Sequence, residues 1–225
     1  MREIKINKVV RSRRRTIALI VTADATLVVR APYHTPLEYI KNLVSEKSAW
    51  IARKLKEAKQ WLQRPAPAFV NGAEFLFLGK RYELSIVEQA AAAVELVETG
   101  KLILAKRVVP DAREVLERWY RAEARKKIAA RCQWYAERTG CKPSTLRITG
   151  ARKRWGSCGA KGTLNFSWRL VMAPQDVIDY VVVHELAHIG QMDHSKLFWD
   201  KVRRIMPDYE RQRQWLRDNE RLLTF

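Results

Sequence analysis

The sequence has few features of secreted or membrane proteins. Its three cysteines are odd in number and lack C-x-x-C spacing, so we expect reduced thiols rather than a disulfide framework or a cysteine-based metal site. No stretch approaches the roughly 20 consecutive apolar residues that a membrane-spanning helix needs. The charged N-terminal residues are not followed by an apolar signal segment. These absences predict a cytoplasmic protein with no membrane partner.

Phosphate-binding glycines and histidines are also scarce. There is no G-x-x-x-x-G-K-S/T loop of the kind that holds nucleotide phosphates, and residues 1–109 contain no grouping of catalytic side chains. The chain has only four histidines, and His184, His188 and His194 fall within eleven residues. We assign a local turn contact to the fourth, His34. The chemistry of the protein is therefore expected around the other three.

The spacing of His184, Glu185 and His188 indicates a metal site. In a helix, positions four apart lie one above the other on the same face, so His184 and His188 can direct two imidazoles at one ion. Glu185 lies one residue round the helix, where its carboxylate can hold a water on the metal rather than the metal itself. Gly190 is suited to end the helix in the left-handed region, and the chain can then turn back and supply His194.

Three protein ligands and one open position are what catalytic zinc requires, whereas structural zinc usually has four ligands. We therefore predict one Zn²⁺ per chain, held by His184, His188 and His194. Zinc lowers the pKa of its bound water to roughly 7, and Glu185 would take the proton as that water attacks.

The competing explanation for these residues is structural. H-E-x-x-H occurs by chance in helices, and paired histidines can cap a helix or form salt bridges. However, the apolar run Ile178–Val183 leads straight into the motif and indicates a buried helix. An ionisable cluster on a buried helix is costly without a partner. We therefore favour a metal site over core histidines.

Positive charge is the second strong feature of the sequence. It has 43 lysine and arginine residues against 24 aspartate and glutamate residues, a formal net charge of +19. The excess lies in residues 1–64 and 111–225, whereas residues 65–110 are balanced. Such a field attracts polyanions, nucleic acid among them, although a generally basic surface without a specific partner explains the charge equally well. The arginines of one short segment are candidates for phosphate contact: Arg11, Arg13, Arg14 and Arg15.

The order of the elements predicts an α+β protein of two domains. Residues 1–109 form a β-rich N-terminal subdomain with one long helix at about 36–64, whose apolar residues recur at helical spacing. Short β-branched runs between residues 74 and 104, separated by glycine-containing turns, predict a meander of antiparallel strands. Residues 110–225 form the catalytic domain.

Ordered motifs in the chain carry a family resemblance. Those in the C-terminal half are Arg154–Cys158, Leu164–Phe166, Pro174, Tyr180–His188, His194–Trp199 and Pro207–Tyr209. Weaker matches in the N-terminal half are Arg13–Thr16, Val29–Pro32, Trp50–Ile51 and 71–80. Together they resemble the YgjP-like metallopeptidase family, or domain of unknown function 45, a branch of the small zincins related to SprT and WLM-type proteases. The resemblance covers most of the chain and is strongest over residues 152–216.

This resemblance implies a zincin-like catalytic half, in which helices and a small antiparallel sheet pack around the H-E-x-x-H helix, joined to a β-rich N-terminal half. It places strands next to the cleft, where an edge strand can pair with an extended peptide. Candidates for the cleft wall are Trp155, Gly156 and Ser157. Tyr209 is a candidate for stabilising an oxyanion, with simple packing as its alternative, and Asp193 or Asp200 is a candidate acceptor for a ligand imidazole.

The predicted function is zinc-dependent hydrolysis of a peptide or protein substrate. In such a metallopeptidase, zinc-bound water activated by Glu185 attacks a peptide carbonyl, and Glu185 then returns the proton to the leaving amine. Two alternatives stay open from the sequence. One is a zinc hydrolase of a nucleotide or other phosphate-bearing substrate. The other is a zinc-stabilised protein that binds nucleic acid without catalysis.

Overall fold

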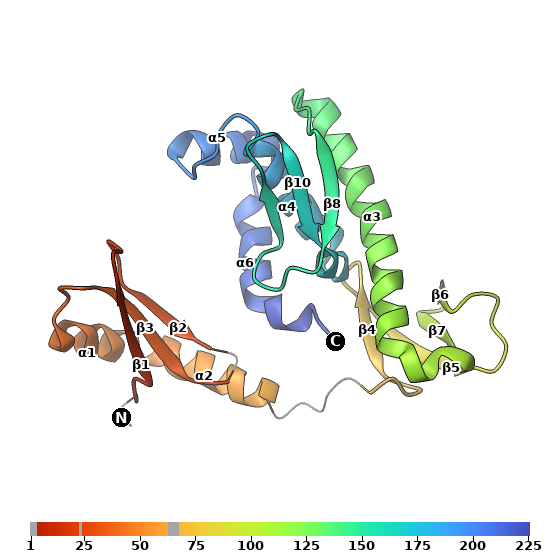
Figure 1. Ribbon diagram of the computed structural model, residues 1–225, viewed down its shortest axis with the longest axis horizontal. Coiled ribbons are helices and arrows are strands. Elements are labelled where there is room, and N and C mark those ends of the chain that lie inside the picture. The colour runs from red at the N-terminus through yellow and green to blue at the C-terminus, as the bar shows by residue number, and fades with distance from the viewer. Residues whose placement is uncertain (1–3, 23, 63–67) are drawn as a thin grey trace. The chain divides into compact units, whose positions relative to one another are not determined.

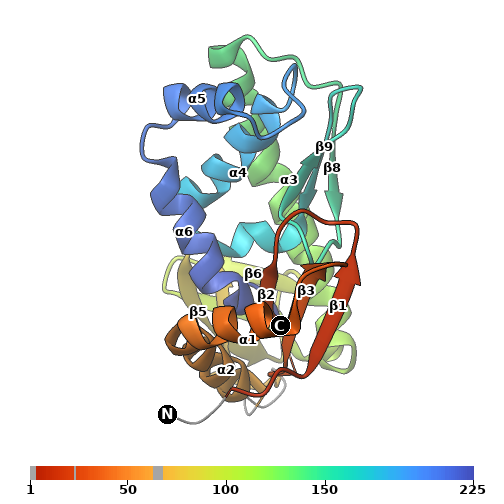
Figure 2. The same ribbon diagram turned by 90° about the vertical axis from the view of Figure 1, so that its left-hand side faces the viewer.

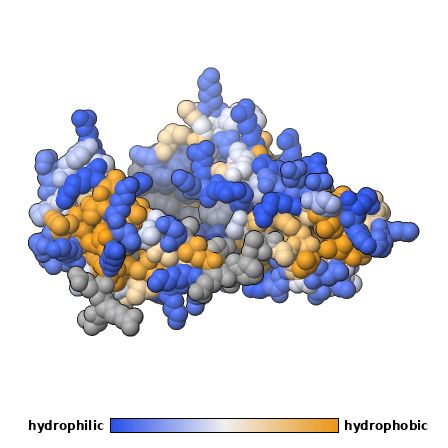
Figure 3. Space-filling view, turned by 60° about the horizontal axis from the view of Figure 1, so that its bottom comes forward, coloured by the Kyte–Doolittle hydropathy of each residue, from blue (hydrophilic) through white to orange (hydrophobic). Residues whose placement is uncertain are grey.

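The computed structural model describes residues 4–22, 24–62 and 68–225 and confirms the α+β class. The chain folds into two compact units, an N-terminal unit, Met1–Ala66, and a C-terminal unit, Pro67–Phe225 (Figure 1). On the face shown in Figure 3, hydrophilic side chains surround smaller hydrophobic areas. None of the helices in the described part of the chain has the length and apolar character needed to span a bilayer.

The N-terminal unit contains a three-stranded sheet and two helices. Its central strand is β3 (Leu27–Pro32), which lies between a parallel strand, β1 (Lys8–Ser12), and an antiparallel strand, β2 (Ala18–Val21). Alternate residues of β3 are fully buried, because successive side chains of a strand point to opposite faces of its sheet. The core of this unit consists of Leu27, Val29, Ala31, Ile40, Val44 and Ile51.

The prediction of one long helix at 36–64 is wrong, because two helices occupy the segment. α1 spans Leu37–Glu46 and α2 spans Ser48–Leu62, while residues 63 and 64 lie outside the described part of the chain. Lys47 separates the helices with φ −92° and ψ 13°, outside the helical well. Packing sets this break, since Ile51 of α2 joins the same core as the buried residues of α1. The segment has no proline or glycine there to signal an interruption.

The C-terminal unit begins with a four-stranded sheet. Its strands are β4 (Glu74–Phe77), β5 (Lys80–Val87), β6 (Val94–Val97) and β7 (Lys101–Ala105), in the order β4-β5-β7-β6. The predicted antiparallel meander is wrong at its centre, because β5 and β7 are parallel while both outer pairs are antiparallel. After β5 the chain crosses to the far edge of the sheet to form β6, and β7 then returns between β6 and β5.

A second sheet of three strands lies later in this unit. β10 (Thr163–Ser167) is central, β8 (Thr145–Thr149) runs parallel to it, and β9 (Gly156–Cys158) runs antiparallel on its other side. The sheet is therefore mixed, not antiparallel as predicted. After β8 the chain crosses the sheet to form β9 at the far edge. The β9–β10 hairpin then returns β10 to the centre, where β10 runs parallel to β8. This topology makes β9 an edge strand.

Four helices complete the unit: α3 (Ala112–Thr139), α4 (Gln175–Ala187), α5 (Lys196–Ile205) and α6 (Tyr209–Asn219). Short 3₁₀ turns are η1 (Lys106–Asp111), η2 (Trp168–Met172) and η3 (Glu220–Leu222). Figure 2 shows α4 between α3 and α6, and both helices contact it. Residues 177–183 of α4 are all buried, as the apolar run in the sequence predicts for a helix that is enclosed on every side.

The predicted domain boundary near residue 109 does not coincide with the division between the units, which falls after Ala66. The β4–β7 sheet stays with the helices because its inward residues share their core. Leu78 and Gly79 also donate backbone hydrogen bonds to η2, at 2.9 and 3.0 Å. Gly79 has φ +77°, and a Cβ there would lie 2.8 Å from Pro174, the residue before α4. Sheet residues in the shared core are Phe75, Phe77, Leu84, Val94, Leu102 and Leu104.

An ion pair joins α3 to α4. Arg131 donates from Nε and Nη2 to the two carboxylate oxygens of Asp179 at 2.5 and 2.7 Å. We predict that Asp179→Ala lowers the free energy of unfolding by about 2 kcal/mol, because it leaves a half-buried guanidinium without its partner. As a control, Lys126→Ala removes the pair of a solvent-exposed lysine with Glu123 and should change this free energy by less than about 1 kcal/mol. Urea unfolding followed by tryptophan fluorescence measures both variants, and equal losses would contradict this account of how α4 is held.

Candidate metal centre

The H-E-x-x-H motif lies at the C-terminal end of α4. His184 and Glu185 belong to its last turn, and His188 follows with φ −66° and ψ −19°, so its backbone is still helical. The imidazole centroids of His184 and His188 are 5.0 Å apart, which is the separation expected for side chains at positions i and i+4. The helix ends because Gly190 takes φ +92°, a left-handed conformation that glycine adopts without steric cost.

The turn after Gly190 brings the third histidine to the other two. Nε2 of His194 lies 3.1 Å from Nε2 of His184, and one ring nitrogen from each of the three histidines lies within 4.8 Å of the others. Nitrogens on a tetrahedral zinc at roughly 2.0–2.1 Å would be about 3.3 Å apart. The cluster therefore fits one zinc ion with small side-chain adjustments.

The second ring nitrogens of two histidines differ in their surroundings. His188 Nδ1 lies 3.0 Å from the backbone carbonyl of Gln191. Because a carbonyl can only accept, Nδ1 carries the proton and Nε2 is left with a lone pair for a metal. The buried Nδ1 of His184, in contrast, has no hydrogen-bond partner within the described residues. Such an unpaired buried group costs about 1–3 kcal/mol, so stability alone does not explain this cluster.

The two aspartates predicted to orient a ligand imidazole have other partners. Asp193 accepts hydrogen bonds from Gln191 Nε2 at 2.6 Å and from the Ser195 backbone at 3.1 Å, which hold the turn between α4 and α5. Asp200 accepts from Lys196 at 3.0 Å. The turn that presents His194 is therefore stabilised by Asp193, while the acceptor beside His188 is a backbone carbonyl.

Phe198 of α5 packs among the three imidazoles. Its ring centroid lies 4.9, 4.4 and 4.8 Å from those of His184, His188 and His194, and its side chain is fully buried. A rigid aromatic ring that touches all three restricts the rotamers they can adopt. Phe198 thus fixes the arrangement of the cluster without supplying a donor atom.

Burial controls the charge of the ionisable groups at the site. It lowers the pKa of His184 to about 3, with further contributions from His188, His194 and Arg213, and it also lowers the pKa of His194. These imidazoles are therefore neutral at physiological pH, the form in which histidine coordinates metals. Burial raises the pKa of Glu185 to about 8, which places its proton exchange near neutral pH.

A cavity of about 260 Å³ contains Glu185 and His184 in its lining. Three parts of the unit form it: the start of β9, the α4 helix, and α6 with the η3 turn. The lining residues are Trp155, Gly156, Tyr180, Val181, His184, Glu185, Arg213, Leu216, Arg217 and Glu220. His184, one member of the cluster, and Glu185 therefore face a cleft of a size that admits part of a substrate.

Gly156, the first residue of β9, lies against Glu185. A Cβ at this position would be 2.5 Å from Oε1 and 2.6 Å from Cγ of Glu185. Only glycine therefore fits while the Glu185 side chain keeps its position. Because β9 pairs only with β10 among the described strands, the site has an edge strand next to the carboxylate.

The other candidates for substrate contact differ in position. Trp155 lines the cavity together with Gly156. The Oγ of Ser157 instead accepts a hydrogen bond from Asn165 at 3.4 Å, which holds β9 to β10. Tyr209 is buried, stacks on Tyr180 with a centroid separation of 6.2 Å, and donates to a neighbouring glutamate. Tyr180, rather than Tyr209, reaches the cavity.

The four arginines between residues 11 and 15 differ in whether their side chains have partners. Arg11 lies in β1, and its Nη1 donates to three backbone carbonyls at the end of β3 and just beyond it, so its guanidinium holds the loop after β3. Those carbonyls, at 3.2, 2.9 and 2.7 Å, belong to Pro32, Tyr33 and Thr35. Arg14 donates to Thr16 at 3.4 Å, whereas Arg13 and Arg15 are exposed. Only part of this segment is therefore free to meet a phosphate.

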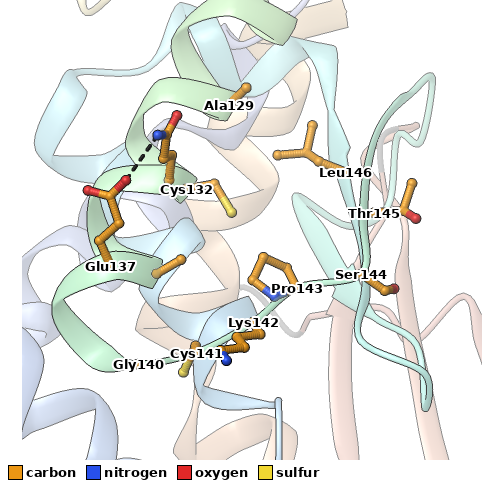
Figure 4. Close-up of a pocket in the computed structure, with 12 residues that line it drawn as sticks. Ala129, Cys132, Glu137, Gly140, Cys141, Lys142, Pro143, Ser144, Thr145 and Leu146 are labelled. Atoms are coloured by element: carbon orange, nitrogen blue, oxygen red, sulfur yellow. Dashed lines mark hydrogen bonds between the residues drawn. The ribbon is translucent and has the colours of Figure 1, made fainter.

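A second cavity, of about 570 Å³, lies between the end of α3 and the start of β8 (Figure 4). Cys132 and Cys141 line it together with mostly apolar groups. Burial raises the pKa of Cys132 to about 11, so this thiol stays protonated at physiological pH. The cavity has none of the histidines or Glu185 in its lining and is separate from the candidate metal centre.

Several residues of the site were not predicted from the sequence. Tyr180 had a signal, because it precedes His184 by four residues and so shares its helix face. Phe198 lies within one of the motifs that carry the family resemblance, but nothing in the motif indicates its contact with three imidazoles. Arg213 and Arg217 had no local signal, since tertiary packing alone brings α6 to α4.

A buried helix whose end supplies two histidines and a glutamate, joined by a third histidine from the following turn, is typical of metal-dependent hydrolases. The chain belongs to the family described as YgjP-like, metallopeptidase domain, whose family model matches residues 15–219. The match confirms the resemblance seen in the sequence and supports a metal-dependent hydrolase that acts on peptides.

The comparison with curated proteins gave no match. Among solved structures, the chain is similar to the metallopeptidase zymogen of Pyrococcus abyssi abylysin, at 18% sequence identity and a TM-score of 0.37. That similarity covers 40% of this chain and 93% of the other.

Lys201 of α5 provides a test of how the end of α4 is held. Its ammonium donates to the carbonyls of Ala187 and Ile189 at 3.2 and 2.9 Å, which the end of a helix otherwise leaves unpaired. We predict that Lys201→Met weakens zinc binding roughly tenfold, because groups that support ligand residues contribute on this scale. Lys196→Met, on the exposed side of the same helix, should leave zinc affinity unchanged. Competition with a chromogenic chelator measures both, and equal affinities would contradict a supporting role for Lys201.

Proposed function

We propose that this protein is a zinc-dependent peptidase whose site consists of His184, His188, His194 and Glu185. The observation that carries the proposal is the convergence of three imidazole nitrogens within 4.8 Å beside a buried glutamate in a cleft. Membership of a metallopeptidase family supports the same conclusion.

The donor set favours zinc over harder cations. Three imidazoles suit zinc, whereas calcium and magnesium prefer oxygen ligands. His184, His188 and His194 would hold one ion and leave one position open for water or substrate. When bound, zinc lowers the pKa of a coordinated water and polarises a carbonyl group.

Glu185 is the residue proposed to move the proton. Its carboxylate faces the cavity next to His184, and Gly156 leaves it no room on the strand side. The carboxylate would accept the proton of the attacking water and deliver it to the amine nitrogen as the peptide bond breaks. Tyr180 also lines the cavity, and its phenol would donate to the oxygen that develops negative charge.

The edge strand β9 is proposed to bind the substrate backbone. Peptidase substrates are bound extended, and an exposed strand edge offers backbone groups that pair with them. β9 begins at Gly156, in contact with Glu185. A peptide paired with β9 would therefore pass the catalytic carboxylate.

Zinc content is the first test of this function. We predict about one zinc per chain in the purified protein, and loss of that zinc in His188→Ala. His34→Ala is the matched control, because His34 is exposed and lies outside the cluster, and it should retain the metal. Elemental analysis measures all three, and equal zinc content in His34→Ala and His188→Ala would contradict the assignment of ligands.

Glu185→Gln tests the proton-transfer role separately from metal binding. The amide has nearly the shape of the carboxylate, so the variant should keep its zinc and lose roughly 10²–10⁴-fold in the rate of peptide hydrolysis. Hydrolysis is measured on a peptide library by mass spectrometry. Undiminished hydrolysis by a zinc-loaded variant would rule out Glu185 as the base.

Gly156→Ala tests the contact between β9 and Glu185. The new methyl group would displace the end of the glutamate side chain, so we predict that the protein folds and keeps zinc but loses roughly 100-fold in kcat/KM. Gly159→Ala is the control, because the nearest atom to its Cβ is an ordinary 3.7 Å away. If both variants hydrolyse peptides at the wild-type rate, the position of Glu185 in this structure is not the catalytic one.

A further inference from the structure

Two arginines of α6 face the cleft without a carboxylate partner. Arg213 and Arg217 both line the cavity that contains Glu185, and because they are four residues apart they share one face of the helix. Neither makes an ion pair within the described residues. Glu220 lines the same cavity but pairs with neither arginine in the described structure.

Aromatic side chains hold Arg213 in place. Its guanidinium carbon lies 4.6 Å from the ring centroid of Trp199, a cation–π contact. Trp199 in turn stacks on Tyr209 with centroids 5.3 Å apart, and Tyr209 stacks on Tyr180 of the cavity lining. A guanidinium held in this way loses little conformational entropy when it binds an anion.

The charge of Arg213 acts close to the candidate metal centre. Arg213 and His184 line the same cavity, and the Trp199 ring beneath the Arg213 guanidinium lies 5.7 Å, centroid to centroid, from the His184 imidazole. A ligand group that binds Arg213 therefore lies near the reacting bond. The cavity is small, at about 260 Å³, below the roughly 300–1,000 Å³ of pockets that enclose drug-sized ligands. It has room for one side chain rather than a whole nucleotide.

We propose that this cavity binds an acidic side chain of the peptide substrate, with Arg213 and Arg217 as specificity-determining residues. The inference rests on the proposed peptidase function and adds its substrate class. A glutamate or aspartate next to the scissile bond would place its carboxylate between the two guanidinium groups. Guanidinium groups form charge-assisted and bidentate hydrogen bonds with carboxylates.

The test begins with the zinc-loaded protein and a peptide library, from which mass spectrometry identifies a cleaved sequence. Matched fluorogenic peptides then carry glutamate or glutamine at each position within two residues of the scissile bond. At one position, kcat/KM should be roughly ten- to a hundredfold higher for glutamate, the effect of one charge-assisted hydrogen bond on this rate. Equal kcat/KM values at every position would overturn the inference.

Variants of α6 separate recognition from structural effects. Arg217 is exposed, so Arg217→Glu should fold and keep its zinc, and it should prefer a lysine peptide over the glutamate peptide. Arg213→Gln should lower the ratio of kcat/KM for glutamate over glutamine. The control is Arg211→Gln, which removes an exposed charge from the same helix away from the cavity lining and should leave that ratio unchanged. If Arg217→Glu retains the preference for glutamate, the assignment is wrong.

Binding measurements distinguish a failure of this inference from a failure of the proposed function. Glu185→Gln loaded with zinc should bind the glutamate peptide more tightly than the glutamine peptide in fluorescence anisotropy. That preference without any hydrolysis by the wild-type protein would support the acidic subsite and contradict the peptidase. Hydrolysis without any preference between the two peptides would support the peptidase and contradict the acidic subsite. A third outcome is that neither peptide binds, whereas ATP binds strongly to the wild-type protein and not to Arg217→Glu. That result would assign the arginines to a phosphate ligand and overturn the inference.

Discussion

The burial of α4 is the constraint on which the rest of the site depends. A helix enclosed on all sides cannot shift or rotate without disturbing the packing of α3, α5 and α6, and its ion pair with α3 fixes it further. The last turn of this helix carries His184 and Glu185, so their positions follow from the hydrophobic core and not from flexible loops. The same burial keeps His184 and His194 neutral and the glutamate readily protonated. The packing of the core thereby holds these side chains in protonation states suited to metal binding and proton transfer.

The third histidine depends on a different set of contacts. Gly190 ends the helix, Asp193 holds the following turn, and Phe198 and Lys201 join α5 to the end of α4. His194 therefore approaches His184 through a short, well-supported turn of the chain. On the opposite side, Gly156 brings β9 against Glu185 at a distance that no larger residue permits. The cleft is thus defined by a helix end, a turn and a strand edge.

Local features of the sequence predicted the buried helix and its end, and they predicted little of what surrounds it. The spacing of His184 and His188, the apolar run before them and Gly190 are all read within a few turns of one helix, and they correspond to the geometry observed. The break at Lys47, the parallel pairing of β5 with β7 and the division after Ala66 depend on packing between distant segments. Arg213 and Arg217 belong to the same class, since only the tertiary fold brings them to the cleft. The helical spacing of Tyr180 from His184 indicates the shared face, whereas nothing local indicates that Tyr209 stacks on Tyr180.

The most direct test of a catalytic zinc held by three histidines is X-ray absorption at the zinc edge of the purified protein. The account predicts about three nitrogen ligands at roughly 2.0–2.1 Å with imidazole scattering, together with an oxygen ligand at a similar distance. A sphere closed by sulfur at about 2.3 Å, or a protein that takes up no zinc when it is supplied, would contradict it.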